Sequence, residues 1–206
     1  YPVELIREIH AAKDLSVCEE ILREESPQFS EHYITHEVLS YFPPEAFAGK
    51  RVLDFGCGAG ASTMALARLL PPCEIVGIEL EPRLLNLAHR RGQLLGLKGV
   101  RLHQSPSGDA LPSGIGQFDF ILFNAVFEHL LPHERPALLG KIWAQLKPGG
   151  VLFLNQTPHR YSPVEVHTTG GLPFLNYLPD GLALRYARKC SRRVRPNESW
   201  ESLLRR

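Results

Sequence analysis

The sequence predicts an α/β fold in which a parallel, doubly wound sheet is covered by helices. Between residues 51 and 154, short apolar runs alternate with stretches of helical periodicity, and parallel neighbours need a helix to return the chain from one strand to the next. The chain has 206 residues, of which 44% are hydrophobic and 22% charged. This length and composition suit one compact domain and exclude a disordered chain.

The N-terminal part and the sheet region are predicted in this order. Helical periodicity in residues 1–48 indicates two or three helices, which we expect to form a lid and to end at Pro43-Pro44. Five strands are predicted at residues 52–55, 75–78, 100–102, 118–123 and 151–154. Helices are predicted between them at residues 61–70, 82–95 and 134–146. The expected strand order is 3-2-1-4-5.

The C-terminal part has a weaker pattern. Gly149-Gly150 predicts a turn that ends the third of these helices and begins the fifth strand. Residues 157–181 contain four prolines and three glycines, which favours an extended loop or cap over a sheet. Helical patterns follow at 182–190 and 198–204, and no sixth or seventh strand is predicted. We therefore divide the chain into N-terminal helices (1–48), a sheet core (49–156) and a C-terminal loop and helix cap (157–206).

Charge and cysteine content restrict the partners and the compartment. Lys and Arg total 23 against 22 Asp and Glu, so no field of one sign recruits a polyanion or a membrane surface. The sequence thus predicts neither a nucleic-acid partner nor a membrane partner. Four cysteines without a Cys-x-x-Cys pair indicate reduced thiols and a cytoplasmic compartment. The chain starts at Tyr1 and stops within a helical pattern, so we expect a fragment of a longer protein.

A glycine-rich loop follows the first predicted strand and opens a helix. It reads Asp54-Phe-Gly56-Cys-Gly58-Ala-Gly60. Glycines permit positive φ and close approach of a ligand to the backbone, and the helix N-terminus offers free amide donors. About twenty residues on, the second strand ends at Glu79, where the hydroxyls of a ribose would lie.

Two nucleotide cofactors fit this placement. A dinucleotide site prefers a third glycine one residue later than Gly60, and the carboxylate of Asp54 repels a pyrophosphate. The same carboxylate can hold a cationic amine, directly or through water, and can also fix the loop by accepting its amides. The amine and sulfonium of S-adenosylmethionine therefore suit the loop better than a dinucleotide.

Four segments carry a family resemblance over residues 48–156. They begin at Val52, Val76, Gln117 and Leu146 and read Val-Leu-Asp-Phe-Gly-Cys-Gly-Ala-Gly, Val-Gly-Ile-Glu-Leu-Glu-Pro, Gln-Phe-Asp-Phe-Ile-Leu-Phe-Asn-Ala-Val-Phe-Glu-His-Leu and Leu-Lys-Pro-Gly-Gly-Val-Leu. In this order and spacing they resemble the motifs of class I S-adenosylmethionine-dependent methyltransferases. The resemblance implies a Rossmann-like fold, S-adenosylmethionine as the cofactor, S-adenosylhomocysteine as the product, and methyl transfer.

The resemblance also implies roles for single residues. It implies that Gly56, Cys57 and Gly58 line the methionine moiety, with Gly60 in the same loop. It further implies that Glu79 binds the ribose, that Leu80 packs on adenine, and that Asn124 and Ala125 flank the sulfonium.

Departures from the family pattern leave two points open. The family often has Gly-Asp-Ala directly after the third strand, whereas here Gly108-Asp109-Ala110 is displaced, so either Asp109 or Ser107 contacts adenine. The motifs typical of DNA or RNA base amine methylation are missing, which favours a small-molecule acceptor.

Acceptor contacts are expected from two further segments. His129 follows the fourth strand, and His159, Glu165 and His167 lie in the proline-rich segment. His129, His159 and His167 are the candidate catalytic residues, because an acceptor that must lose a proton needs a base. We expect no metal at this cluster. Tyr33 and the first helices are expected to close over the cofactor, and two rival functions remain: a non-catalytic partner subunit and an NAD-dependent oxidoreductase.

Overall fold

The computed structural model describes residues 1–12, 18, 21–22, 25–26, 28–157, 159, 161–166 and 168–204. The chain divides into two compact units. Unit 1 comprises Tyr1–Asn124 and Ala137–Asn155, and unit 2 comprises Ala125–Pro136 and Gln156–Arg206. The N-terminal helices therefore group with the sheet. Whether they act as a lid stays a prediction.

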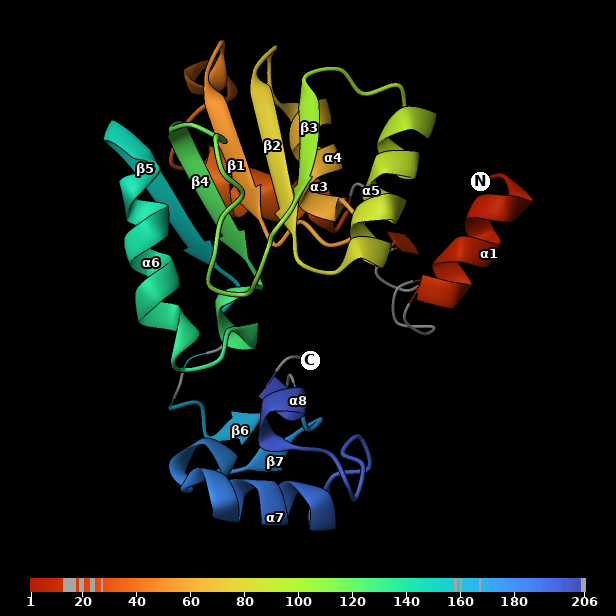
Figure 1. Cartoon of the computed structure of the whole chain (residues 1–206), viewed down its shortest axis with the longest axis vertical. Helices are drawn as coiled ribbons and strands as arrows, with labels where there is room; N and C mark the ends of the chain where they lie inside the picture. The colour runs from red at the N-terminus through yellow and green to blue at the C-terminus, as the bar shows by residue number, and fades with distance from the viewer. Residues whose placement is uncertain are drawn as a thin grey trace. The chain divides into compact units, whose positions relative to one another are not determined.

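Unit 1 is built on a five-stranded parallel sheet in the order β3-β2-β1-β4-β5 (Figure 1). The strands are β1 (Arg51–Phe55), β2 (Glu74–Glu79), β3 (Val100–Gln104), β4 (Phe118–Asn124) and β5 (Leu146–Asn155). This order confirms the predicted arrangement. Because all five strands run the same way, their carboxyl ends share one edge of the sheet, where Asn124 pairs in register with Asn155.

The predicted glycine turn lies inside β5 rather than before it, so the prediction of its place was wrong. The register between β4 and β5 shifts between Phe118 and Phe120, where residues 147–150 bulge out of β5. A Cβ on Gly150 would lie 2.9 Å from the carbonyl oxygen of Lys147. The glycine pair thus permits a tight bulge within the strand and does not separate a helix from it.

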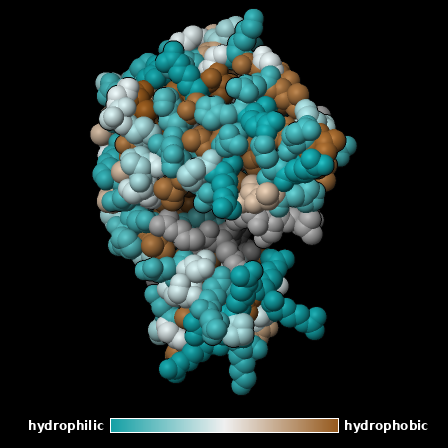
Figure 2. Space-filling model, turned by 45° about the vertical axis from the view of Figure 1, so that its right-hand side comes forward, coloured by the Kyte–Doolittle hydropathy of each residue, from teal (hydrophilic) through white to brown (hydrophobic). Residues whose placement is uncertain are grey.

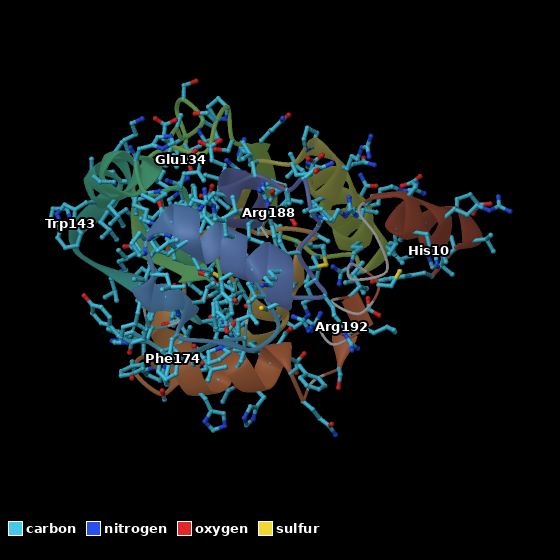
Figure 3. The ribbon with its side chains drawn as sticks, turned by 90° about the horizontal axis from the view of Figure 1, so that it is seen from below. His10, Glu134, Trp143, Phe174, Arg188 and Arg192 are labelled. Carbon is cyan, nitrogen blue, oxygen red and sulfur yellow. The ribbon has the colours of Figure 1, made fainter. Side chains whose placement is uncertain are left out.

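Three helices connect the strands: α4 (Ala61–Leu69), α5 (Pro82–Leu94) and α6 (Glu134–Ala144). Their observed ends lie within two residues of the predicted ends. Figure 1 shows α4 with α3 on one face of the sheet and α6 on the opposite face, as a doubly wound sheet requires. Trp143, labelled in Figure 3, lies near the end of α6 and is 69% exposed.

The N-terminal part contains α1 (Val3–Ala12), α3 (Ser30–Ile34), the π-helical turn η1 (Thr35–Leu39) and the 3₁₀ turn η2 (Pro44–Phe47). The predicted stop at the proline pair holds, because Pro43 is extended. Part of the second predicted helix lies outside the described residues. The core between these elements, α4 and the sheet consists of apolar side chains: Ile34, Val38, Phe47, Val52, Ala65, Leu66, Leu70, Ile75, Phe120, Leu122 and Phe153.

Unit 2 contains short elements only: η3 (Phe127–His129), β6 (Val164–Glu165), β7 (Leu172–Pro173), η4 (Leu175–Tyr177), α7 (Asp180–Cys190) and α8 (Trp200–Leu204). Strands β6 and β7 form an antiparallel pair of two residues each. The prediction that residues 157–181 hold no strand was therefore wrong. The pair forms because the intervening turn brings the Gly171 N–H within 2.8 Å of the Glu165 carbonyl oxygen.

Local polar contacts and a small core hold unit 2 together. The carboxylate of Glu165 accepts hydrogen bonds from the backbone N–H groups of Thr168 and Thr169, at 2.8 and 2.7 Å. The apolar core comprises five buried side chains: Leu175, Ala183, Ala187, Val194 and Leu203. The surface of unit 2 that is seen in Figure 2 is mostly hydrophilic. Figure 3 shows two of its arginines, Arg188 on α7 and Arg192 beyond the end of α7.

No helix among the described residues is both long enough and apolar enough to cross a membrane.

Candidate functional site

The glycine-rich loop joins β1 to α4 at the carboxyl edge of the sheet. Gly56, Gly58 and Gly60 have φ values of 73°, 53° and 90°, in the left-handed region that favours glycine. The N–H groups of Gly56 and Cys57 donate to the carbonyl oxygen of Ile78 at 2.8 and 3.0 Å. These bonds fix the loop against the end of β2.

The two glycines that flank Ala59 differ in what surrounds them. A Cβ on Gly60 would lie 2.7 Å from Cε of Met64 and 3.1 Å from Cβ of Ala88, so Gly60 serves the packing of α4 against α5. A Cβ on Gly58 would meet nothing within 4 Å. The open side of the loop is therefore at Gly58.

Asp54 lies at the base of the loop and is 1% exposed. Its Oδ2 accepts hydrogen bonds from the Ser62 hydroxyl at 2.7 Å and the Thr63 hydroxyl at 2.5 Å. Burial raises the pKa of the Asp54 carboxyl, the two hydroxyl donors oppose that rise, and the nearby charge of Glu79 adds to it. Asp54 thus ties the start of α4 to β1.

Glu79 ends β2 and holds two loops at once. Its Oε2 accepts a hydrogen bond from the Gly58 N–H at 2.9 Å, and its Oε1 accepts one from the Glu81 N–H at 2.8 Å. Each carboxylate oxygen has a second lone pair that can accept a further donor. Among the described residues, no Lys or Arg pairs with Asp54 or Glu79.

Cys57 packs under the loop and is 3% exposed. Burial raises the pKa of its thiol well above the ordinary value, and the charges of Asp54 and Glu79 act in the same direction. The side chain fits because β2 has glycine at position 77, where a Cβ would lie 3.0 Å from the Cys57 sulfur. A thiol that stays protonated is a poor nucleophile, which agrees with a packing role.

The end of β3 holds both alternatives for the adenine contact. The Ser107 hydroxyl donates to Oδ1 of Asp109 at 2.7 Å, so the two side chains form one polar pair. Buried Ser105, which sequence reasoning missed, donates from its hydroxyl to the Ala110 carbonyl oxygen at 2.7 Å and shapes this turn. Leu80, expected to pack on adenine, is 41% exposed beside the end of β2.

Tyr33 of α3 meets two asparagines at the ends of β4 and β5. Its hydroxyl donates to Oδ1 of Asn124 and also interacts with the Asn155 side chain. Burial raises the pKa of the Tyr33 phenol far above its ordinary value. The Nδ2 atoms of Asn124 and Asn155 are buried and have no hydrogen-bond partner among the described residues. The Nδ2 of Asn124, whose Oδ1 is held by Tyr33, is therefore a buried donor that remains available there.

Sequence reasoning missed several members of this arrangement. Asn155 is identified by the same rule that identified Asn124, since both end parallel neighbours in register. Ser62 and Thr63 are less evident, because hydroxyl residues at a helix start are common caps. Arg91 of α5 was also missed, although its spacing from the buried residues Leu87 and Ala88 places it on the buried face of the helix.

Unit 2 holds the remaining predicted residues. Ala125 has φ 53°, a left-handed conformation that is unusual for a residue other than glycine. His129 ends η3 and is half-buried. His159 is exposed, and its Nδ1 accepts the Tyr161 N–H at 3.2 Å. His167 lies outside the described residues.

No group of three or more His, Cys, Asp or Glu side chains in the described part of the chain is placed to hold a metal ion.

Comparison with known proteins identifies the family. Residues 52–150 match the family model described as a methyltransferase domain. Phthiotriol/phenolphthiotriol dimycocerosates methyltransferase from Mycobacterium leprae is 37% identical over 107 residues, which cover 51% of this chain and 37% of that protein. An S-adenosylmethionine-bound amino pentose methyltransferase from Micromonospora echinaspora has a TM-score of 0.50 at 29% identity, covering 66% of this chain and 54% of that one. Residues 52–150 thus match a methyltransferase domain, and the fold around them is that of class I S-adenosylmethionine-dependent methyltransferases.

The relatives of this methyltransferase domain have different named activities. Ubiquinone biosynthesis O-methyltransferase from Cereibacter sphaeroides is 30% identical over 157 residues, covering 72% of this chain and 60% of the relative. Carboxy-S-adenosyl-L-methionine synthase from Escherichia coli is 29% identical over 116 residues, covering 52% and 44%. The chain thus spans between 37% and 60% of the length of these curated relatives. The cofactor of the domain is S-adenosylmethionine.

Proposed function

We propose that this chain is a methyltransferase that moves a methyl group from S-adenosylmethionine to a small-molecule acceptor. The observation that carries the proposal is the pair of carboxylates Asp54 and Glu79, which no Lys or Arg of the described chain neutralises. Such a site favours the ammonium and sulfonium of S-adenosylmethionine and disfavours the pyrophosphate of a dinucleotide.

Different residues of the loop are assigned to different groups of the cofactor. We assign the methionine end to Gly56, Cys57 and Gly58, where Gly58 leaves open space. Asp54, directly or through water, attracts the ammonium group. Gly60 holds the loop to the helices behind it.

The strand ends receive the other parts of the cofactor. We assign the ribose hydroxyls to the free lone pairs of Glu79, and the adenine ring to Leu80 with the Ser107–Asp109 pair. Tyr33 positions Asn124, whose unpartnered Nδ2 donates toward the ligand, with Ala125 next to it. When bound, S-adenosylmethionine supplies a methyl group on a cationic sulfur that leaves as a neutral thioether.

Unit 2 supplies the acceptor site in this proposal. The chain enters unit 2 directly after Asn124 and again after Asn155, the two asparagines of the cofactor edge. Within unit 2 lies a cavity of about 420 Å³, which suits a small molecule. Its lining is mostly uncharged: Gln156, Thr157, His159, Ser162, Val164, Glu165, Val166 and Asn176. These features support a neutral, polar acceptor.

His159 in this cavity is poised to donate a hydrogen bond. Because its Nδ1 accepts the Tyr161 N–H, the neutral ring carries its proton on Nε2. In this tautomer His159 donates a hydrogen bond that orients an oxygen or nitrogen of the acceptor. Another group must then remove the proton from the acceptor. His129 is then the described candidate for the base, and His167 keeps its sequence-based assignment. A cytoplasmic location, supported by four free cysteines, belongs to the same proposal.

Transfer of a labelled methyl group tests this function. The protein is incubated with methyl-labelled S-adenosylmethionine and the small-molecule extract of its source organism, and products are read by mass spectrometry. We expect label in a small molecule and one equivalent of S-adenosylhomocysteine. His159→Ala is expected to lower turnover with cofactor affinity within about threefold, since it meets only the acceptor. His133→Ala, an exposed histidine of unit 2, is the matched control and keeps full turnover.

Two results contradict the proposal. Cofactor binding without any label transfer supports the non-catalytic partner subunit, and label found only in protein or nucleic acid overturns the small-molecule acceptor.

A further inference from the structure

Arg91 is a buried charged residue that the proposed function does not use. It lies in the last turn of α5 and is 1% exposed. A buried guanidinium is costly unless hydrogen-bond acceptors surround it. The hydrogen-bond partners of Arg91 therefore indicate the structural role of its guanidinium group.

The guanidinium joins the cofactor loop to the N-terminal segment. Its Nη1 donates to the carbonyl oxygen of Ala59 at 2.6 Å, in the middle of the glycine loop. Its Nε donates to the Tyr1 hydroxyl at 3.0 Å, and its Nη2 lies 3.7 Å from Oε1 of Glu25. One side chain thus donates hydrogen bonds to the loop and to Tyr1 and forms an ion pair with Glu25.

Apolar packing follows the same path. Leu5 and Ile9 of α1, together with Ile21, form one buried cluster with Ala59 of the loop and Leu87 of α5. Figure 1 shows α1 beside α5, and the two helices are in contact. The methyl group of Ala59 therefore packs against N-terminal side chains while its carbonyl oxygen is held by Arg91.

The other contacts of the loop are made by its glycines and Cys57. They run to β2, through the Ile78 carbonyl oxygen and the Glu79 carboxylate, and to α4 and α5 through Gly60. Gly58 and Gly60 on either side of Ala59 have the broad backbone freedom of glycine. The position of Ala59 is thus set by Arg91 and the N-terminal cluster.

We infer that Arg91 is a positioning residue that couples the N-terminal helix to cofactor binding by holding Ala59 in the glycine loop. The inference rests on the proposal that this loop binds S-adenosylmethionine. Because such coupling is reciprocal, order in α1 favours the cofactor and the cofactor favours order in α1. Helix α1 thereby tunes cofactor affinity through Arg91 and Ala59.

A pair of adjacent arginines provides the test. Arg91→Met replaces the buried charge by an unbranched apolar chain and removes the donor to the Ala59 carbonyl oxygen, which also costs stability. Arg90→Met is the matched control, because Arg90 also lies on α5 and pairs with Glu8 of α1 but has no bond to the loop. We expect Arg91→Met to weaken S-adenosylhomocysteine binding about 3- to 30-fold and Arg90→Met by less than about twofold, measured by calorimetry. Arg91→Lys, which keeps a donor, is expected to restore part of the loss.

Hydrogen exchange on the unmodified protein gives a second readout that needs no variant. S-adenosylhomocysteine is expected to slow amide exchange in α1 as well as in the glycine loop, and to leave residues 137–144 of α6 unchanged. Equal affinities of the Arg91 and Arg90 variants, or unchanged exchange in α1, overturn the inference. Glu79→Ala separates this failure from that of the proposed function. If Glu79→Ala binds S-adenosylhomocysteine as tightly as the unmodified protein does, the loop is not the cofactor site, and the proposed function fails as well.

Discussion

The two units of the chain are stabilised in different ways. Unit 1 buries the two faces of a parallel sheet under helices, and one cluster of its buried apolar residues extends from Ile34 to Phe153. The described part of unit 2 has an apolar cluster of five buried residues and relies on side chains that bond to nearby backbone, such as Glu165. The charges differ as well, since unit 2 has ten Lys and Arg against six Asp and Glu, whereas unit 1 has an acidic excess.

This difference indicates a division of roles. A packed sheet holds the loop and strand ends at fixed positions, which a shared cofactor requires. A small unit of turns and short helices can change its lining without disturbing the sheet, which suits a variable acceptor. If the roles are divided in this way, substitutions in unit 1 change stability and cofactor binding, whereas substitutions in unit 2 change turnover.

The largest effect is expected from the core of unit 1. Phe47 is fully buried, and its ring centroid lies 4.1 Å from that of Phe120. Phe47→Ala should lower the free energy of unfolding by about 3–5 kcal/mol, as other large-to-small changes in cores do. Leu175→Ala, in the small core of unit 2, should cost about 2 kcal/mol and act locally. Urea unfolding with hydrogen exchange measures both, and faster exchange in β1 and β4 of the Leu175 variant would contradict separate cores.

The next effect compares two glutamates that each bind backbone amides. Glu79→Ala removes the acceptor for ribose hydroxyls and the clamp on Gly58, so cofactor affinity should fall about 10- to 150-fold. Glu165→Ala removes the similar clamp in unit 2, so turnover should fall while cofactor affinity changes by less than about threefold. Calorimetry and methyl-transfer assays distinguish the two. A large loss of cofactor affinity in the Glu165 variant would assign cofactor contacts to unit 2.

A smaller effect compares two glycines with positive φ and open surroundings. Gly58 and Gly49 have φ values of 53° and 66°, and a Cβ at either position meets nothing within 4 Å. Each change to Ala should therefore cost about 1–2 kcal/mol of stability from backbone strain alone. Only Gly58→Ala should weaken S-adenosylhomocysteine binding, by about fivefold or more, because its methyl enters ligand space. Equal affinity of the two variants would remove Gly58 from the site.

The smallest effect concerns pH. Burial raises the pKa of Asp54, so the folded protein holds this proton to a higher pH than the unfolded chain does. Asp54 therefore stabilises the unliganded fold at low pH, and this contribution is lost as the pH rises through its folded pKa. A cationic ligand prefers the ionised form, so cofactor affinity should rise over the same interval. Calorimetry at a series of pH values upward from the ordinary range of a carboxyl group should show this slope, and Asp54→Asn should flatten it. An unchanged slope in the variant would place the titration elsewhere.

Sequence periodicity predicted unit 1 well because its elements are set by burial. Strands that are apolar on both faces and helices with one apolar face leave a repeat that can be counted, and the order of five strands followed from it. The glycine loop, Glu79 and Asn124 could be placed because they end strands that share one edge. Asn155 could have been placed by the same rule.

Other features depend on contacts that no local pattern contains. Arg91 bonds to a loop 32 positions earlier in the chain. The bulge at Gly150 depends on the carbonyl oxygen of Lys147 and on β4. Strands β6 and β7 are two residues long, too short for alternation to appear, and their pairing depends on the turn that Glu165 closes. Non-local bonds and very short ladders are thus what the sequence alone could not supply.

The central claim is that unit 1 binds S-adenosylmethionine through a glycine loop flanked by two carboxylates. Calorimetric titration of the purified protein with S-adenosylmethionine, S-adenosylhomocysteine and NAD tests it most directly. The account predicts one site for each of the first two ligands, both bound more tightly at higher pH because both carry the ammonium group, and no heat of binding for NAD. Binding of NAD at this loop, or of none of the three, would contradict it.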